Sequence, residues 1–100
     1  MPTFAQPYIV KVLECSTAHI TSKDNDLLNQ DGMSAPAVYK FEYGHFVYAE
    51  NVFEEQETLA KTGFSEQFIR ILKKANSEGC KFVQFDCDGM EYNDLEKFNW

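Results

Sequence analysis

The chain has 100 residues, of which 44% are hydrophobic and 25% are charged, with five Gly and three Pro. This composition is typical of one globular domain and excludes a disordered, collagen-like or repeat chain. Nine Lys and Arg against 16 Asp and Glu give a formal net charge of −7. Because nucleic acid is itself an anion, this charge disfavours direct binding to DNA or RNA and favours a protein partner with a basic surface.

The cysteines and the apolar runs indicate the cellular compartment of the protein. Cys15, Cys80 and Cys87 are an odd number and lack the spacing of a disulfide framework or of a zinc site. The sequence does not open with a signal segment, and no apolar run approaches the roughly 20 residues that a membrane span needs. We therefore expect reduced thiols in a cytoplasmic protein without membrane contact.

Two elements are predicted in the first third of the chain. Residues 8–15 are mostly β-branched or apolar and follow Pro7, which favours a strand. Residues 20–30 contain Thr21 followed three positions later by Asp24, a pair that resembles a capping box. This pattern predicts a short helix that ends before Gly32.

Residues 37–50 carry five aromatic side chains and give the clearest hairpin signal in the sequence. The turn is expected at Tyr43 and Gly44, where glycine would adopt a positive φ. We expect one aromatic face of each arm to meet the core. These faces are formed by Tyr39, Phe41 and Tyr43 in the first arm and by Phe46 and Tyr48 in the second.

Two helices and a last strand are predicted in the second half. Residues 52–62 have acidic residues near their start and a lysine near their end, the charge order that a helix dipole favours. Gly63 ends this helix, and Ser65 caps a second, more strongly amphipathic helix that stops at Gly79. Residues 80–87 alternate in polarity as a strand does.

This order of elements predicts an α+β fold made of a single domain over residues 1–100. We expect a largely antiparallel sheet of about four strands, with two to three helices packed on one face. The order of the strands in the sheet stays open.

Three segments of the sequence resemble a known family. They are Ser16-Thr17-Ala18-His19-Ile20-Thr21 with Asp24, Asn25, Leu27 and Leu28; Gly63-Phe64-Ser65-Glu66 with Phe68, Ile69 and Leu72; and Phe85-Asp86-Cys87-Asp88-Gly89 with Phe98-Asn99-Trp100. They are similar to the small acidic proteins of enterobacterial plasmids and prophages, a domain of unknown function often encoded near antirestriction and toxin–antitoxin genes. The resemblance implies a mobile-element accessory protein that binds host or rival machinery, and it supplies no catalytic residue.

Residues 50–57 and 86–96 are acidic stretches without a basic residue. Carboxylates at such density can occupy the cationic groove of a nucleic-acid enzyme, with aromatic side chains as anchors, although most acidic runs only keep a surface solvated. The expected function is a non-enzymatic inhibitor of a host defence or nucleic-acid-processing protein. The residues expected to bind the partner are Glu50, Glu54, Glu55, Glu57, Asp86, Asp88, Glu91, Tyr92, Asp94, Glu96 and Trp100.

The alternative is a small enzyme or a ligand- or metal-binding domain. Its site would gather His19, Asp86, Cys87 and Asp88 at adjoining strand ends. The residue types fit, but the spacing matches neither a thiol enzyme nor a calcium-binding loop, so we assign no catalytic residue, cofactor or metal ligand and leave open whether the chain is an enzyme. A third possibility is a structural oligomer in which the aromatic hairpin pairs edge to edge.

Overall fold

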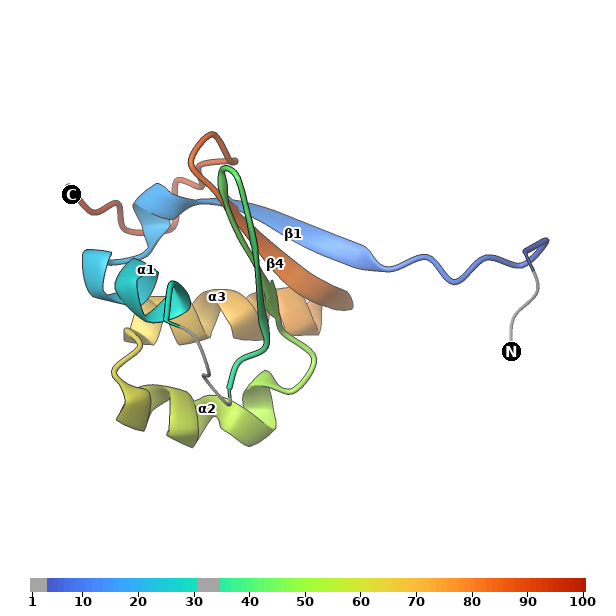
Figure 1. Cartoon of the computed structure of the whole chain (residues 1–100), viewed down its shortest axis with the longest axis horizontal. Helices are drawn as coiled ribbons and strands as arrows, with labels where there is room; N and C mark the ends of the chain where they lie inside the picture. The colour runs from blue at the N-terminus through green and yellow to red at the C-terminus, as the bar shows by residue number, and fades with distance from the viewer. Residues whose placement is uncertain (1–3, 31–34) are drawn as a thin grey trace.

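The computed structural model describes residues 4–30 and 35–100 and confirms the α+β class (Figure 1). Its four strands are β1 (Lys11–Ser16), β2 (Val38–Phe41), β3 (Gly44–Tyr48) and β4 (Cys80–Asp86). They lie in the order β1-β4-β3-β2. β1 is parallel to β4, whereas β3 is antiparallel to both β4 and β2, so the sheet is mixed.

The helices are η1 (Thr17–His19), α1 (Ser22–Leu28), α2 (Val52–Thr62) and α3 (Glu66–Ser77). α1 and α3 begin at the caps that the sequence predicts, whereas η1 was not predicted and no cap was predicted for α2. Thr21 and Asp24 form a complete capping box on α1, and the Ser65 hydroxyl accepts a hydrogen bond from the backbone of α3. α1 is shorter than expected, because its first residues serve as the cap, and Gly32 lies outside the described residues. Over residues 4–30 and 35–100, no helix has the length and apolar character that crossing a membrane requires.

The bounds of two strands differ from the prediction. β1 begins at Lys11 rather than at residue 8, because β4, its neighbour in the sheet, begins opposite it at Cys80. β4 ends at Asp86 rather than at Cys87. Residues 4–10 therefore leave the sheet as an arm without a neighbouring strand, and Figure 1 shows this arm projecting from the body.

The hairpin is confirmed, but the expected role of Gly44 is wrong. Its φ is not positive, and Gly44 is the first residue of β3 rather than a turn residue. A Cβ atom at this position would lie 1.8 Å from the carbonyl oxygen of Phe85 on β4. Glycine is needed here because the two backbones approach closely.

The expectation that the aromatic faces of the hairpin meet the core is also wrong. The buried positions of β3 are His45, Val47 and the residue that follows the strand, Ala49. Phe68 of α3 stacks on Phe85 of β4 with 5.6 Å between ring centroids. Because Phe68 of α3 and Phe85 of β4 fill much of this side, β3 contributes His45, Val47 and Ala49 to it, and the aromatic residues of the hairpin turn to the other side.

A buried carboxylate joins the starts of α1 and α3. Asp24 is fully buried. Its oxygens accept the Thr21 N–H at 3.0 Å, the Ser65 N–H at 2.8 Å and the Ser65 hydroxyl at 2.6 Å. The charge is thus compensated by hydrogen bonds that also fix the two helices relative to each other.

Candidate functional site

The side of the sheet opposite the buried strand residues is covered with aromatic rings. We call it the aromatic face; its residues are Val12, Glu14, Tyr39, Phe41, Phe46, Tyr48, Phe82 and Gln84, which the strand register places side by side. Tyr39 is 59% exposed, and the rings on β3 and β4 are half-buried. A contiguous exposed aromatic surface of this kind is uncommon on a monomer, and such surfaces are often functional.

The rings of the aromatic face hold one another in place. Phe82 meets Tyr48 at 5.6 Å and Tyr39 at 6.1 Å between centroids, both edge to face. Phe41 and Phe46 lie 5.0 Å apart. Such pairs each contribute about 0.5–1.5 kcal/mol beyond the area that they bury. The face is therefore a preformed platform with little side-chain freedom left to lose on binding.

Carboxylates stand around the aromatic face. Glu50 accepts a hydrogen bond of 2.7 Å from the Tyr48 hydroxyl, and this bond is the main reason why the pKa of Tyr48 is raised. Asp86, at the end of β4, accepts a 3.4 Å hydrogen bond from the Gln84 amide. Glu14 lies beside Gln84 on the neighbouring strand. Negative charge is thus present at three places on the margin of this face.

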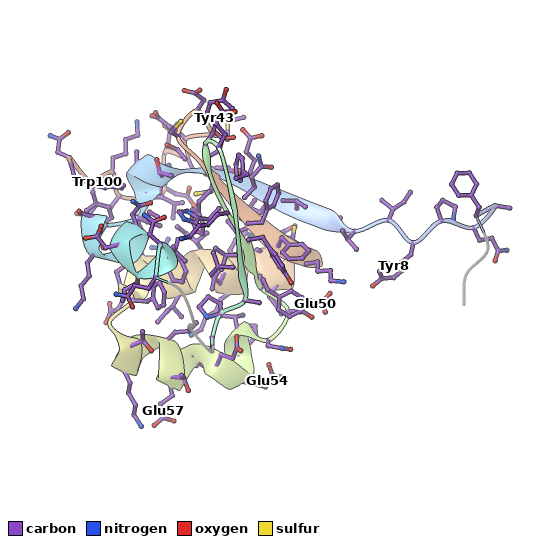
Figure 2. All side chains as sticks on the ribbon, viewed as in Figure 1. Tyr8, Tyr43, Glu50, Glu54, Glu57 and Trp100 are labelled. Atoms are coloured by element: carbon purple, nitrogen blue, oxygen red, sulfur yellow. The ribbon has the colours of Figure 1, made fainter. Side chains whose placement is uncertain are left out.

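The acidic residues expected to form the binding site do not come together in one patch. Figure 1 shows α2 and the C-terminal tail, residues 87–100, on opposite sides of the molecule, and in Figure 2 Glu50, Glu54 and Glu57 lie far from Trp100. Of the expected residues, Glu50 and Asp86 adjoin the aromatic face.

Several of the other expected carboxylates have partners of their own. Glu57 pairs with Lys61 at 3.4 Å, and Glu91 pairs with Lys97 at 2.7 Å, which lowers the pKa of Glu91. Burial, and then the charge of Glu54, raise the pKa of Glu55. Exposed pairs of this kind contribute little to stability.

Tyr92 and Trp100, the expected aromatic anchors, fasten the tail to the body. The Tyr92 hydroxyl donates a 2.6 Å hydrogen bond to the carbonyl of Glu14 on β1. The Trp100 indole N–H donates a 2.9 Å hydrogen bond to the carbonyl of Ile20. Both side chains therefore stabilise the fold.

His19 also serves the tail. The Tyr92 backbone N–H donates to its Nε2 at 2.9 Å, and its Nδ1 lies 3.0 Å from the Glu96 carbonyl. Since a backbone N–H only donates and a carbonyl only accepts, the ring is the neutral tautomer with its proton on Nδ1. Both nitrogens are occupied, so this fully buried side chain orders the tail instead of offering a free base.

The structure does bring Asp86, Cys87 and Asp88 together. One donor atom of each lies within 4.8 Å of the others, a spacing that suits a divalent cation. The Asp86 carboxylate already accepts the Asp88 N–H at 2.8 Å, as in an ordinary turn.

Burial raises the pKa of another thiol, Cys15, to about 12, which makes it inert as a nucleophile.

A cavity of about 350 Å³ beside the hairpin turn is lined by His45, Asn29, Cys87 and Trp100, among other residues. The His45 Nε2 lies 2.9 Å from Oδ1 of Asn29, so Nε2 carries the proton. Nδ1 is buried without a partner among the described residues. Burial, and then the charge of Lys40, lower the pKa of His45, which keeps the ring neutral. No sequence pattern around His45 predicts that its side chain is buried.

A larger groove of about 780 Å³ runs between β1, α3 and the tail. Leu13, Cys15, Ile71 and Leu95 give it an apolar lining, and Arg70 stands among the basic residues around it. This groove lies between β1 and α3 and extends along β1 as far as Val12 and Glu14.

A family model matches most of the sequence that forms this fold. A family model described as "Family of unknown function (DUF5983) C-terminal domain" matches residues 12–100. The chain belongs to this family. The DUF5983 C-terminal domain thus contains the aromatic face, both cavities and the tail, whereas residues 4–10 lie outside the match. Neither the curated proteins nor the solved structures contain a match to the chain.

Proposed function

We propose that the chain is a non-enzymatic protein-binding module whose aromatic face docks on a basic protein surface. The observation that carries this proposal is the platform of contacting rings on the sheet with carboxylates at its margin. In this proposal the helices cover only the opposite side of the sheet and leave the platform free.

The chemistry of the platform specifies the partner. Exposed rings are the anchors that dominate protein interfaces, and they attract Arg and Lys side chains that lie over them. The carboxylates of Glu14, Glu50 and Asp86 would meet further cations, and the net charge of −7 would speed the encounter. A basic surface with apolar patches satisfies both features at once.

The same platform is less suited to single-stranded nucleic acid. Bases stack on aromatic rings, but that mode of binding also needs cations that follow the phosphate backbone. Lys81, next to Phe82 on β4, already lies with its ammonium group 5.7 Å from the centre of the Tyr8 ring. The carboxylates would repel phosphate, so a protein is the better fit.

The resemblance noted in the sequence suggests one biological form of this function. The partner would be a defence or nucleic-acid-processing protein in the cytoplasm of a cell that carries a mobile element, because such proteins expose cationic grooves. The alternative, an active site that includes His19, is less favoured because both nitrogens of that ring are bonded to the backbone.

Capture from an enterobacterial lysate tests the proposal. The wild-type chain, Tyr39→Glu and Phe53→Glu are immobilised, the lysate is treated with nuclease, and retained proteins are identified at low and high salt. Phe53 is a matched control, since it is 50% exposed against 59% for Tyr39 but lies on α2.

We expect the wild type and Phe53→Glu to retain the same basic protein at low salt and to release it at high salt, and Tyr39→Glu to retain none. Equal retention by Tyr39→Glu, or the absence of any salt-sensitive basic protein, would contradict the proposal. A cooperative urea unfolding transition of Tyr39→Glu, with a loss no larger than the about 0.5–1.5 kcal/mol of its ring contact with Phe82, shows that its loss of binding is not a loss of fold.

A further inference from the structure

We infer that two copies of the chain pair antiparallel through the outer edge of β1, joining their sheets into one, and that the arm of each copy enters the groove of the other. The arm is residues 4–10. This inference is independent of the proposed function, because it uses the edge of the sheet and not the aromatic face.

The hydrogen bonds of β1 show which of its backbone groups point outward. The Ser16 N–H donates to the Met90 carbonyl at 2.9 Å, and the Glu14 carbonyl accepts from the Tyr92 hydroxyl. Both groups therefore point away from β4. Because backbone direction alternates along a strand, the N–H of Glu14 and both backbone groups of Val12 also point outward.

These outward groups form an open strand edge. β4 is the neighbour of β1 in the sheet, and the tail reaches the outer edge at Ser16 and at the Glu14 carbonyl. In the part of the chain that the structure describes, no hydrogen bond is made by the outward groups of Val12 or by the Glu14 N–H. An edge of this kind is a template for a further strand.

The arm supplies that strand. It continues directly from β1 and stands clear of the body in Figure 1, where no other segment lies beside its outer part. Phe4 is 98% exposed and Ile9 is 82% exposed, values that are costly for side chains of this size. Its contact with the body is made by Tyr8, which lies under Lys81 at the end of the sheet.

One register uses the open groups of β1 together with the Glu14 carbonyl, which already accepts one hydrogen bond from the Tyr92 hydroxyl. If Val12 faces Val12 of the second copy across a two-fold axis, Val10 of each copy faces Glu14 of the other. The outward backbone groups of Val10, Val12 and Glu14 then pair with one another, and Ser16, which is already bonded to the tail, is not needed. The Glu14 carbonyl, which accepts from the Tyr92 hydroxyl, takes the second hydrogen bond on its other lone pair. Paired side chains point to the same side, so the two aromatic faces become continuous.

The same register places Ile9 of the second copy opposite Cys15. Cys15 points to the α3 side of the sheet and lines the groove, together with Leu13 and Leu95. Ile9 would therefore enter an apolar groove of about 780 Å³. Each copy leaves an apolar side chain exposed and an apolar groove empty, and the exchange of arms removes both.

Charge gives this contact a distinctive salt dependence. Two copies of net charge −7 repel each other. The contact itself is made by backbone groups and by neutral side chains such as Val10, Val12 and Ile9. Added salt screens the repulsion and is expected to strengthen pairing, whereas it weakens binding to a basic partner.

Sedimentation equilibrium tests the pairing. We expect the wild type to dimerise, more tightly at higher salt, and Ile9→Glu to raise the dimer dissociation constant by at least about tenfold, because a charge would enter an apolar groove. Tyr43→Glu is the control, since Tyr43 is 53% exposed at the hairpin turn, and it should dimerise like the wild type. A wild type that stays monomeric at every soluble concentration, or an Ile9→Glu dimer of unchanged affinity, would overturn the inference.

Cross-linking tests the register in a Cys87→Ser background, which removes the exposed thiol and leaves the two buried ones. Val12→Cys should form a covalent dimer on mild oxidation with diamide, because the two Val12 positions face each other. Glu14→Cys should not, because its two copies would lie about 14 Å apart along the strands at 3.4 Å per residue. Equal cross-linking of both variants, or none of Val12→Cys, would overturn the register.

Different variants test the proposed partner binding and the proposed pairing through β1. Tyr39→Glu should lose the basic partner and keep the dimer, while Ile9→Glu should keep the partner and lose the dimer. An Ile9→Glu variant that keeps both therefore overturns the pairing and leaves the proposed function intact.

Discussion

Two irregular segments flank β1, and they are held very differently. The tail, residues 87–100, is bonded to the body along its length, through Met90 to Ser16, Tyr92 to His19, Glu96 to Gln67, Phe98 to Ala18 and Trp100 to Ile20. In the described part of the chain, the arm contacts the body through the Tyr8 ring, whose centre lies 5.7 Å from the Lys81 ammonium group. Both segments lack helix and strand, so partners rather than secondary structure decide which one belongs to the fold. We propose that the arm binds a second copy of the chain.

Of the changes that test this contrast, replacing His19 should lower the free energy of unfolding most, because His19 helps to hold the tail on the body. His19→Ala leaves the Tyr92 N–H and the Glu96 carbonyl without partners and opens a cavity, so we expect the free energy of unfolding to fall by about 3 kcal/mol. Urea unfolding measures this change. A loss below about 0.5 kcal/mol would show that the tail does not depend on this ring.

Gln67 is the second residue whose side chain holds the tail on the body by hydrogen bonds. Its amide donates to the carbonyls of His19 and Glu96 at 2.7 and 2.8 Å and accepts the Glu96 N–H at 3.0 Å. Gln67→Ala should lower the free energy of unfolding by about 1–2 kcal/mol. The neighbouring exposed Glu66→Ala is the control, and an equal loss in both variants would mean that the change acts on α3 and not on the tail.

A pH dependence should report on the cavity at the end of the tail, which His45 and Trp100 both line. The pKa of His45 is lower in the folded chain than the ordinary value of 6.5. The unfolded chain therefore gains the proton first as pH falls, and stability declines below pH 6.5 until the folded ring is protonated too, with a slope of at most about 1.4 kcal/mol per pH unit.

His45→Gln tests this contribution, because glutamine does not titrate. Its free energy of unfolding should fall less steeply between pH 7 and 5 than that of the wild type. Identical slopes for the two proteins would mean that His45 binds its proton equally well in the folded and unfolded chains.

Removing the arm should have the smallest effect. A chain that starts at Lys11 should unfold within about 0.5 kcal/mol of the wild type at concentrations where both are monomeric, because residues 4–10 are all exposed. Thermal and urea unfolding measure this. A loss above about 1 kcal/mol would show that the arm belongs to the fold of the single copy.

Local signals predicted most of the elements. The capping pair at Thr21 and Asp24, the stop at Gly63 and the alternation of residues 80–87 act within a few positions, and the structure contains them. The side of the hairpin that faces the core was predicted wrongly, because both of its sides carry apolar residues. The packing of α3 against the sheet decides which side of the hairpin is buried. The alternation of residues along a strand does not predict which side a helix covers.

The candidate site was less predictable still. The acidic stretches are evident in the sequence, but their separation follows from the placement of α2 and of the tail. The bonds that hold the tail join residues such as His19 and Glu96, which are 77 positions apart. The aromatic face depends on the order β1-β4-β3-β2, which no local pattern contains.

Residue-resolved amide exchange at low and high protein concentration tests the contrast between a closed and an open side of β1 most directly. At both concentrations we expect slow exchange at Ser16, Tyr92 and Phe98, whose N–H groups are bonded. The amides of Val12 and Glu14 should exchange fast when the protein is dilute and become protected when it is concentrated. Fast exchange throughout the tail, or protection of Val12 that does not change with concentration, would contradict this account.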